Sequence, residues 1–274
     1  MRLLFIMALF LHIPVWRLQA QQAALPVPAL RIAVIGSSTA AGTGASTPDS
    51  AWVGRYRAYL QGDFPGSEVL NLGKGGYSGY QLLPDGAGPF RARPVVDSSR
   101  NISKAIAFRP HAVIVNLPSN DTVSGHSAEE QLDNLEKIAL ESLRNGAFVW
   151  VCTTQPRNLP PDRMATQKAV RDGILQRFGP FAIDLWTPLA APNDSLSVLF
   201  DAGDGVHLND DGHAAVFNQV VQKDLPGMLA QFWQNALPAA ELLETAAQAT
   251  AHPVSKGCFG ALAHRLRRWG RSRD

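Results

Sequence analysis

A serine at a strand-to-helix turn is the first residue whose position could support chemistry. Residues 31–35 form a short β-branched apolar run, typical of a strand buried on both faces of a parallel sheet. The chain then turns through Gly36, Ser37 and Ser38 into a run of small residues. Ligands of open α/β sheets bind beyond the carboxyl ends of the strands. The Ser38 hydroxyl, beside the N–H groups that begin a helix, is therefore a candidate nucleophile.

A glycine-rich turn after a first strand can also bind a dinucleotide or a phosphate. Gly36, Gly42 and Gly44 do not fit the G-x-G-x-x-G pattern of a dinucleotide-binding turn, and the lysine of a phosphate-binding P-loop is missing. A plain structural turn remains an alternative for this stretch alone. A catalytic Ser38 therefore requires partners elsewhere in the chain.

A base and its orienting acid stand three residues apart near the end of the predicted domain. His207 could take the proton of a serine, and Asp204 could fix the tautomer of the imidazole and stabilise its charged form. The Asp-x-x-His spacing is weak evidence on its own, because a loop histidine beside an aspartate is often a surface pair. His213 lies at a helix start, where we expect a structural role. The other candidates considered have no obvious acidic or serine context: His111, His126 and His252.

Two further positions could stabilise an oxyanion. Asn120 follows an apolar strand and could donate its side-chain amide, and the glycine-rich turn at 71–76 could present the backbone N–H of Gly76. A turn-capping role is an equal alternative for Asn120 alone. All of these segments are predicted at one edge of the sheet, which favours a shared site.

Length and composition indicate one α/β domain with a tail at each end. The 274 residues can bury a sizeable core, and a net charge of +2 without a basic stripe through the domain gives no support for nucleic-acid binding. Two cysteines make no disulfide framework: Cys152 is expected in the core and Cys258 in the tail.

Alternating apolar runs and helical patterns predict a parallel sheet covered on both faces. The expected strands are residues 31–35, 68–72, 111–117, 147–152 and 181–186. The expected helices include a segment capped by Asp49 or Ser50, residues 129–143 and 161–178, and a last helix over 214–233. Between them lies a long irregular segment, 77–100, whose aromatic residues Tyr77, Tyr80 and Phe90 could line a cleft or pack onto the body.

The two ends suggest targeting rather than chemistry. Residues 1–20 are typical of a signal peptide, 21–29 of a linker, 30–236 of the folded domain, and 237–274 of an Ala-rich and then basic tail. We expect a monomer exported to the periplasm or medium, with an uncleaved N-terminal membrane anchor as the alternative. The tail is expected to be disordered or partly helical, and it could contact a membrane surface weakly.

These motifs together resemble the SGNH (GDSL-type) hydrolase superfamily over about residues 30–234. Gly36-Ser37-Ser38 is similar to the family's Gly-Asp-Ser, the 71–76 stretch to its Asn-x-Gly-x-x-Gly, residues 118–121 to its Gly-x-Asn-Asp, and residues 204–207 to its late Asp-x-x-His. Ser37 and Pro118 stand where the family has Asp and Gly, and neither change removes a group that transfers a proton or stabilises an oxyanion. Four motifs in the family order, on the expected elements, make a specific resemblance.

The resemblance implies a flavodoxin-like three-layer α/β/α sandwich whose five parallel strands have the order 2-1-3-4-5. It implies a catalytic triad of Ser38, Asp204 and His207, and an oxyanion hole formed by Ser38, Gly76 and Asn120. No metal or cofactor is implied.

The expected activity is that of a serine esterase that forms an acyl-enzyme, with carbohydrate O-acetyl esters as the preferred substrates. Short-chain lipid or aryl esters are the alternative substrates, and a catalytically silent glycan-binding protein is the alternative from another class. Gln155, Arg157 and Tyr77 are the candidate substrate contacts, although Arg157 could instead pair with a surface acid.

Overall fold

The computed structural model describes residues 29–117 and 119–233. The expected signal peptide, nearly all of the linker, Pro118, and the tail with Cys258 lie outside the described residues. Export and membrane contact of the tail therefore stay predictions from sequence.

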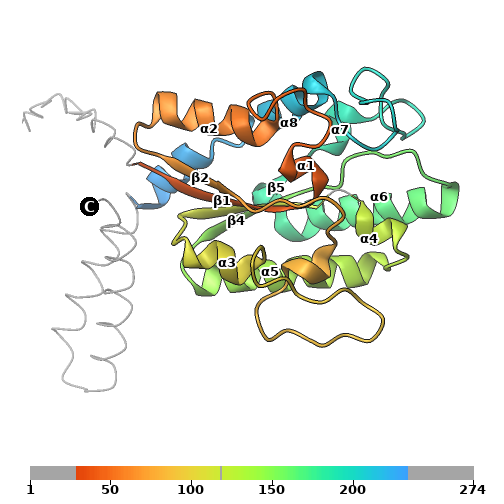
Figure 1. Ribbon diagram of the computed structural model, residues 1–274, viewed down its shortest axis with the longest axis horizontal. Helices are drawn as coiled ribbons and strands as arrows, with labels where there is room; N and C mark the ends of the chain where they lie inside the picture. Colours follow the sequence, from red (N-terminus) through yellow and green to blue (C-terminus); the bar gives the residue numbers. More distant parts are fainter. Residues whose placement is uncertain (1–28, 118, 234–274) are drawn as a thin grey trace, which may run out of the picture.

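The centre of the domain is a parallel sheet with the expected strand order, β2-β1-β3-β4-β5 (Figure 1). Its strands are β1 (Arg31–Gly36), β2 (Glu68–Asn71), β3 (Ala112–Asn116), β4 (Phe148–Cys152) and β5 (Ala182–Ile183). β5 is much shorter than the predicted 181–186, because the carboxylate of Asp184 accepts the N–H groups of Trp186 and Thr187 and starts a short helix, α7 (Trp186–Leu189). The β-branched runs thus form the sheet, and a local side-chain cap ends its last strand.

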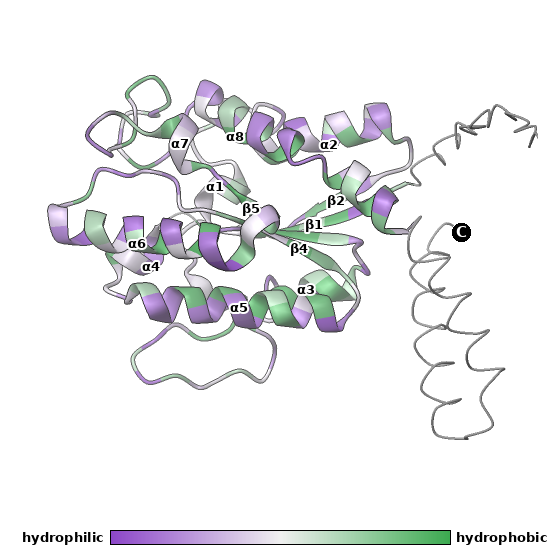
Figure 2. Ribbon diagram, turned by 180° about the vertical axis from the view of Figure 1, so that it is seen from behind, coloured by the Kyte–Doolittle hydropathy of each residue, from purple (hydrophilic) through white to green (hydrophobic). Residues whose placement is uncertain are grey.

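Helices cover both faces of the sheet, as Figure 1 shows. One face carries α2 (Trp52–Asp63) and α8 (Asp210–Gln222). The other carries α3 (Ile102–Ala107), α5 (Ala128–Arg144) and α6 (Pro161–Phe178). Along β1, Ile32 and Val34 pack into the first layer and Ala33 and Ile35 into the second, the two-residue alternation of a strand. Figure 2 shows the strands as strongly hydrophobic and the covering helices as mixed, consistent with a sheet buried on both sides.

Helix ends follow the local hydrogen-bonding chemistry. α5 begins with a capping box between Ser127 and Glu130 and ends at the expected Asn145-Gly146. α2 follows Ala51 rather than a side-chain cap from Asp49 or Ser50. The last predicted helix starts earlier, with the side chain of Asn209 as its cap.

The last predicted helix is also interrupted. The chain turns after α8 and is helical again over residues 225–233. At the turn, Asp224 has a φ of 45° and its carboxylate accepts the N–H of Gly227 at 3.1 Å. This cap starts a second helical segment directly after the first. Because both segments are helical, the periodicity of the sequence predicted one continuous helix.

The long segment after β2 packs onto the body of the domain. It contains a short 3₁₀ helix, η1 (Gly79–Leu82), and the buried Tyr80 ring meets Phe90 edge to face, with the two ring centroids 4.9 Å apart. Tyr77 and Tyr80 therefore belong to the core between the sheet and α3, α5 and α6, with Phe90 packed against it, and do not line a cleft.

Candidate active site

Ser38 is the first residue of α1 (Ser38–Ala41) and lies at the carboxyl end of β1. The turn is tight because β1 passes very close to β3: a Cβ placed on Gly36 would lie 2.1 Å from the carbonyl oxygen of Asn116. The N–H of Ser37 donates to the same carbonyl at 3.1 Å and fixes the start of the helix. The nucleophile candidate is therefore held by the central strands of the sheet.

The glycine turn after β2 lies against this helix. The N–H of Lys74 donates to the carbonyl of Gly36 at 3.2 Å, and a Cβ placed on Gly75 would lie 3.9 Å from the Cβ of Ser38. Gly76 has a φ of 83° and open space where a side chain would stand. Within residues 29–117 and 119–233, the N–H groups of Ser38 and Gly76 have no hydrogen-bond acceptor. Two free N–H groups near the Ser38 hydroxyl are what an oxyanion hole requires.

Close packing of this turn against α1 yields a prediction for Gly73→Ala. The new Cβ would lie 2.6 Å from the N atom of Ala41 and 2.7 Å from the carbonyl carbon of Ala40, so the backbone must move. We expect a loss of about 1–3 kcal/mol in unfolding free energy. Gly62→Ala is the matched control, since its Cβ meets nothing within 4 Å. Urea unfolding of both variants tests this, and equal stability would contradict the packing argument.

Asn120 is the first residue of α4 (Asn120–Val123) and its amide points into the same turn. The Nδ2 group donates to the hydroxyl oxygen of Ser37 at 2.7 Å and to the carbonyl of Tyr77 at 3.0 Å. The hydroxyl oxygen of Ser37, at the position where the family has Asp, thus accepts a hydrogen bond from the Asn120 amide. Contributing to an oxyanion would require one of these N–H groups to be shared or redirected.

Asp204 and His207 form a hydrogen-bonded acid–histidine pair on the loop before α8. Their Oδ2 and Nδ1 atoms are 2.6 Å apart, and the other carboxylate oxygen of Asp204 accepts the N–H groups of Val206 and His207 at 2.9 and 2.8 Å. The backbone N–H and the ring of His207 together hold the pKa of Asp204 at about 2. Because an ionised carboxylate only accepts, Nδ1 of His207 donates in this contact, and the neutral imidazole that makes this hydrogen bond has its lone pair on Nε2. This is the tautomer that a general base needs.

A residue that sequence reasoning missed shapes this loop. The carboxylate of Asp201 accepts the N–H groups of Gly203, Asp204 and Gly205 at 2.9 to 3.1 Å. Gly205 has a φ of 70° and lies against Asn158, whose N–H donates to its carbonyl at 3.0 Å. The Asp201-x-Gly-x-Gly pattern was the available signal, since aspartate and glycine are typical of such turns.

Gln155 joins the helix of Ser38 to the loop of His207. It is 1% exposed, accepts the hydroxyl of Thr39 at 2.7 Å and donates to the carbonyl of Val206 at 2.7 Å. Thr39 and Val206 are the chain neighbours of Ser38 and His207, so this bridge brings the two together. The amide is buried, with both its oxygen and its nitrogen bonded within the fold, so the structure supports a positioning role for Gln155 in place of the expected substrate contact.

Tyr77 is also buried and hydrogen-bonded within the fold. Its ring is buried, its hydroxyl donates to the carboxylate of Asp97, and burial together with that hydrogen bond raises the pKa of Tyr77 to about 12. Its carbonyl receives the amide of Asn120. Tyr77 therefore supports the site through its backbone, and its ring is not presented to a substrate as expected.

Arg157, the third expected substrate contact, is available. Its guanidinium is half-buried, and burial lowers the pKa of Arg157. Nη1 lies 3.4 Å from the hydroxyl of Ser119, beside Asn120, and the negative charge of Asp204 opposes part of the lowering of the Arg157 pKa. Among the described residues, no carboxylate forms an ion pair with Arg157. A cation next to both the acid loop and the Asn120 turn is well placed to meet a substrate.

A second acid–histidine pair, buried where the Asp204–His207 pair is partly exposed, lies on and just after the helix of Asn120. His126 Nδ1 lies 3.0 Å from Asp121, and both residues are buried. The carboxylate of Asp121 also accepts the N–H of Gly79 and so connects η1 to α4. His126 therefore has the acidic partner that its sequence context did not reveal; a spacing of five residues was the only signal.

The described part of the chain holds no group of three or more His, Cys, Asp or Glu side chains that could bind a metal ion. No helix found within residues 29–117 and 119–233 has the length and hydropathy needed to cross a membrane. Cys152 is buried and free, and burial raises the pKa of its thiol.

Comparison with protein families identifies this combination of fold and site. Residues 34–215, more than half of the chain, match the model of the GDSL-like lipase/acylhydrolase family. The chain belongs to that family, and it is an ester hydrolase of the SGNH type. No curated protein sequence matches it significantly.

Solved structures share the fold at low sequence identity. A protein assigned to the G-D-S-L lipolytic family from Desulfitobacterium hafniense DCB-2 is 14% identical with a TM-score of 0.56, covering 71% of this chain and 99% of that one. The esterase EstA from Pseudoalteromonas sp. is 15% identical with a TM-score of 0.52, over 70% and 95% of the two chains. A two-domain esterase active on acetylated mannans is 19% identical with a TM-score of 0.51, over 71% of this chain and 48% of that one.

Proposed function

We propose that this protein is a serine esterase that acts through an acyl-enzyme on Ser38 and that its substrates are O-acetyl esters of carbohydrates. The observation that carries the proposal is the Asp204–His207 pair, with its 2.6 Å contact, on a loop that Gln155 ties to the helix of Ser38. A serine, a base with the correct tautomer and an ionised acid are the parts that this chemistry needs.

The reaction follows from the positions of these groups. Nε2 of His207 takes the proton of Ser38 as the Ser38 oxygen attacks the ester carbonyl. The N–H groups of Ser38 and Gly76 stabilise the oxyanion, and the amide of Asn120 joins them once one of its N–H groups turns from Ser37 or Tyr77. The imidazolium then protonates the leaving alcohol, and the acyl group stays on Ser38. A water molecule, deprotonated by His207, attacks the acyl-enzyme, and collapse releases the acid and returns the proton to Ser38.

The surroundings of Ser38 favour a small acyl group on a polar alcohol. Ser38 is only 6% exposed, and the nearby elements are glycine-rich or polar, with the cation of Arg157 beside them. A long alkyl chain would remove charged and polar groups from water without replacing their hydrogen bonds. The structural neighbour that is active on acetylated mannans supports the same substrate class. Short-chain lipid or aryl esters are the second candidate.

Hydrolysis of p-nitrophenyl acetate and p-nitrophenyl octanoate by the purified protein tests the acyl preference. We expect a higher kcat/KM for acetate, because little open space surrounds Ser38. Release of acetate from acetylated xylan and mannan tests the alcohol. A preference for octanoate would move the proposal to lipid esters, and no turnover of any ester would favour a silent glycan-binding protein.

Arg157 gives a sharper prediction about the alcohol. Arg157→Gln is expected to raise KM for an acetylated oligosaccharide by roughly 10-fold, the scale of a lost charged hydrogen bond. The kcat for p-nitrophenyl acetate should stay within about twofold, because this small ester does not reach the guanidinium. Arg91→Gln, at an exposed position of the long segment, is the control. An unchanged KM for the oligosaccharide would remove Arg157 from the binding site.

A further inference from the structure

A cavity on the far end of the Ser38 helix is not used by the proposed reaction. Its volume is about 280 Å³, near the lower end of ligand-sized pockets at roughly 300–1,000 Å³. It lies between the end of α1, the loop that follows, the start of α2 and the end of β2. The lining residues are Ala41, Gly42, Ala45, Ser46, Thr47, Pro48, Ala51, Val53, Gly54, Arg57 and Asn71. None of the residues proposed for catalysis is among them.

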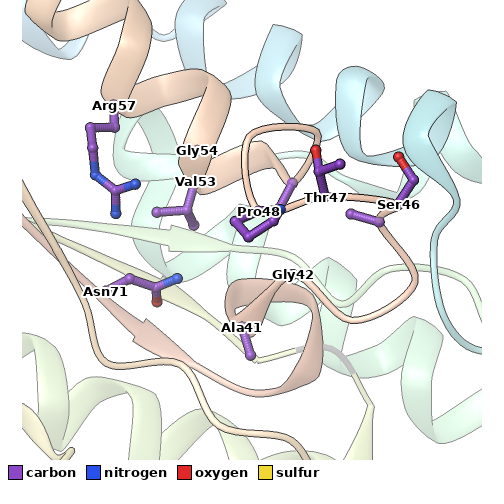
Figure 3. Close-up of a pocket in the computed structure, with 11 residues that line it drawn as sticks. Ala41, Gly42, Ser46, Thr47, Pro48, Val53, Gly54, Arg57 and Asn71 are labelled. Carbon is purple, nitrogen blue, oxygen red and sulfur yellow. The ribbon is translucent and has the colours of Figure 1, made fainter.

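Arg57 supplies the only charge in the cavity wall. It stands one helical turn after Val53 on α2, so both side chains face the cavity, and Figure 3 shows the Arg57 side chain extending towards Asn71. Arg57 is half-buried, and its guanidinium makes no hydrogen bond, ion pair or ring contact with another described residue. A half-buried guanidinium without a counterion is a favourable place for an anion.

The other polar side chains of the cavity are already bonded. Asn71 donates to the carbonyl of Ala40 at 2.7 Å and accepts the N–H of Gly73 at 2.9 Å. The Ser46 hydroxyl contacts Asp210 at 2.5 Å, and the Thr47 hydroxyl contacts Ser50 at 3.0 Å. In Figure 3 the hydroxyls of Ser46 and Thr47 point away from Arg57 and Asn71. Recognition of a ligand would therefore depend on Arg57 and on apolar contacts.

From this arrangement we infer that the cavity binds a small organic carboxylate. The planar guanidinium of Arg57 matches a carboxylate through two parallel hydrogen bonds. The side chains of Ala41, Pro48 and Val53 offer methyl and methylene surface to a short hydrocarbon body. A bare inorganic anion would use the charge but not this surface. The inference does not depend on the proposed reaction, since it uses other residues.

Ligand-observed NMR and calorimetry with butyrate, on the full chain, test this site. We expect butyrate to bind with millimolar or better affinity and butyramide, its neutral analogue, to bind far more weakly. Arg57→Gln should weaken butyrate binding by roughly 10- to 100-fold. Arg55→Gln is the matched control on the same helix, because the Arg55 guanidinium donates outside the cavity, to the carbonyl of Ser50 at 2.9 Å.

Further arms separate this cavity from other sources of binding. Arg57→Lys keeps the positive charge and serves as the second variant if Arg57→Gln loses stability. We expect Arg57→Lys to bind butyrate more weakly than the wild type but more tightly than Arg57→Gln. Butyrate should still bind the Ser38→Ala and Asn120→Ala variants. Binding that disappears with Asn120→Ala would place butyrate in the catalytic site and overturn the inference. It would also be overturned by equal binding of butyramide, by tighter binding of inorganic phosphate, by unchanged binding in Arg57→Gln, or by no binding to wild type.

Discussion

Ser38→Ala is expected to lower kcat/KM for p-nitrophenyl acetate by at least roughly 1000-fold, leaving only the residual catalysis that the oxyanion hole and substrate binding supply. The reason is that no other hydroxyl takes its place at the first residue of α1, between the free N–H groups and the loop of His207. The fold should be unaffected, because the Ser38 hydroxyl donates no hydrogen bond to another residue that the structure describes and alanine is a good helix former.

The control for this variant is Ser124→Ala, at the exposed end of α4. It should keep wild-type turnover and wild-type thermal stability. A phosphonate ester that reacts with catalytic serines provides an independent readout: mass spectrometry should find the adduct on wild-type protein and not on Ser38→Ala. An adduct that persists in the Ser38→Ala variant would place the nucleophile elsewhere.

Asp204→Asn is expected to lower kcat by roughly 10⁴-fold while KM changes little. An amide can donate to Nδ1 of His207 and so favour the tautomer in which Nε2 bears the proton and cannot act as a base. Asp211→Asn, at an exposed position on α8, is the matched control and should retain activity. A loss of less than about tenfold in Asp204→Asn would show that His207 does not need this acid.

The depressed pKa of Asp204 gives the same variant a pH signature. The pKa of Asp204 is about 2 in the folded protein and lies below the ordinary value of 3.8. A carboxyl group whose pKa is lower in the folded than in the unfolded protein stabilises the fold at pH values above its unfolded-state pKa. This contribution is lost as the pH falls through the folded-state pKa. The difference in stability between wild type and Asp204→Asn should therefore be present at neutral pH and shrink between about pH 4 and pH 2, which thermal melts can follow.

The fold was predictable because its strands carry their own signal. Five apolar runs, alternating with helical patterns, specified a parallel sheet covered on both sides, and the 2-1-3-4-5 order came from the family resemblance and is confirmed. The errors lie where a single side chain decides the end of an element. Asp184 ends β5 and Asp224 divides the last predicted helix, and neither effect leaves a periodic trace in the sequence.

The sequence was sufficient to predict which residues lie together at one edge of the sheet, because the carboxyl ends of parallel strands meet there. What each side chain does there depends on tertiary contacts. Gln155 and Tyr77 follow strands as a substrate contact would, yet one is bonded between two loops and the other is packed against Asp97. The charge of Arg57 faces a cavity formed by residues 41–57 and by Asn71 at the end of the next strand, and the spacing of these residues in the sequence does not indicate a cavity.

The bridge through Gln155 has a consequence for how the protein gains activity as it folds. It connects Thr39 to a residue 116 positions later in the chain, and it then connects to Val206 across a further 51 positions. Closing such long loops is slow compared with forming helices and neighbouring strand pairs. During synthesis, the nucleophile emerges from the ribosome long before its base. In refolding experiments, esterase activity should therefore appear after the circular dichroism of the sheet and helices has recovered, as the last event to be completed.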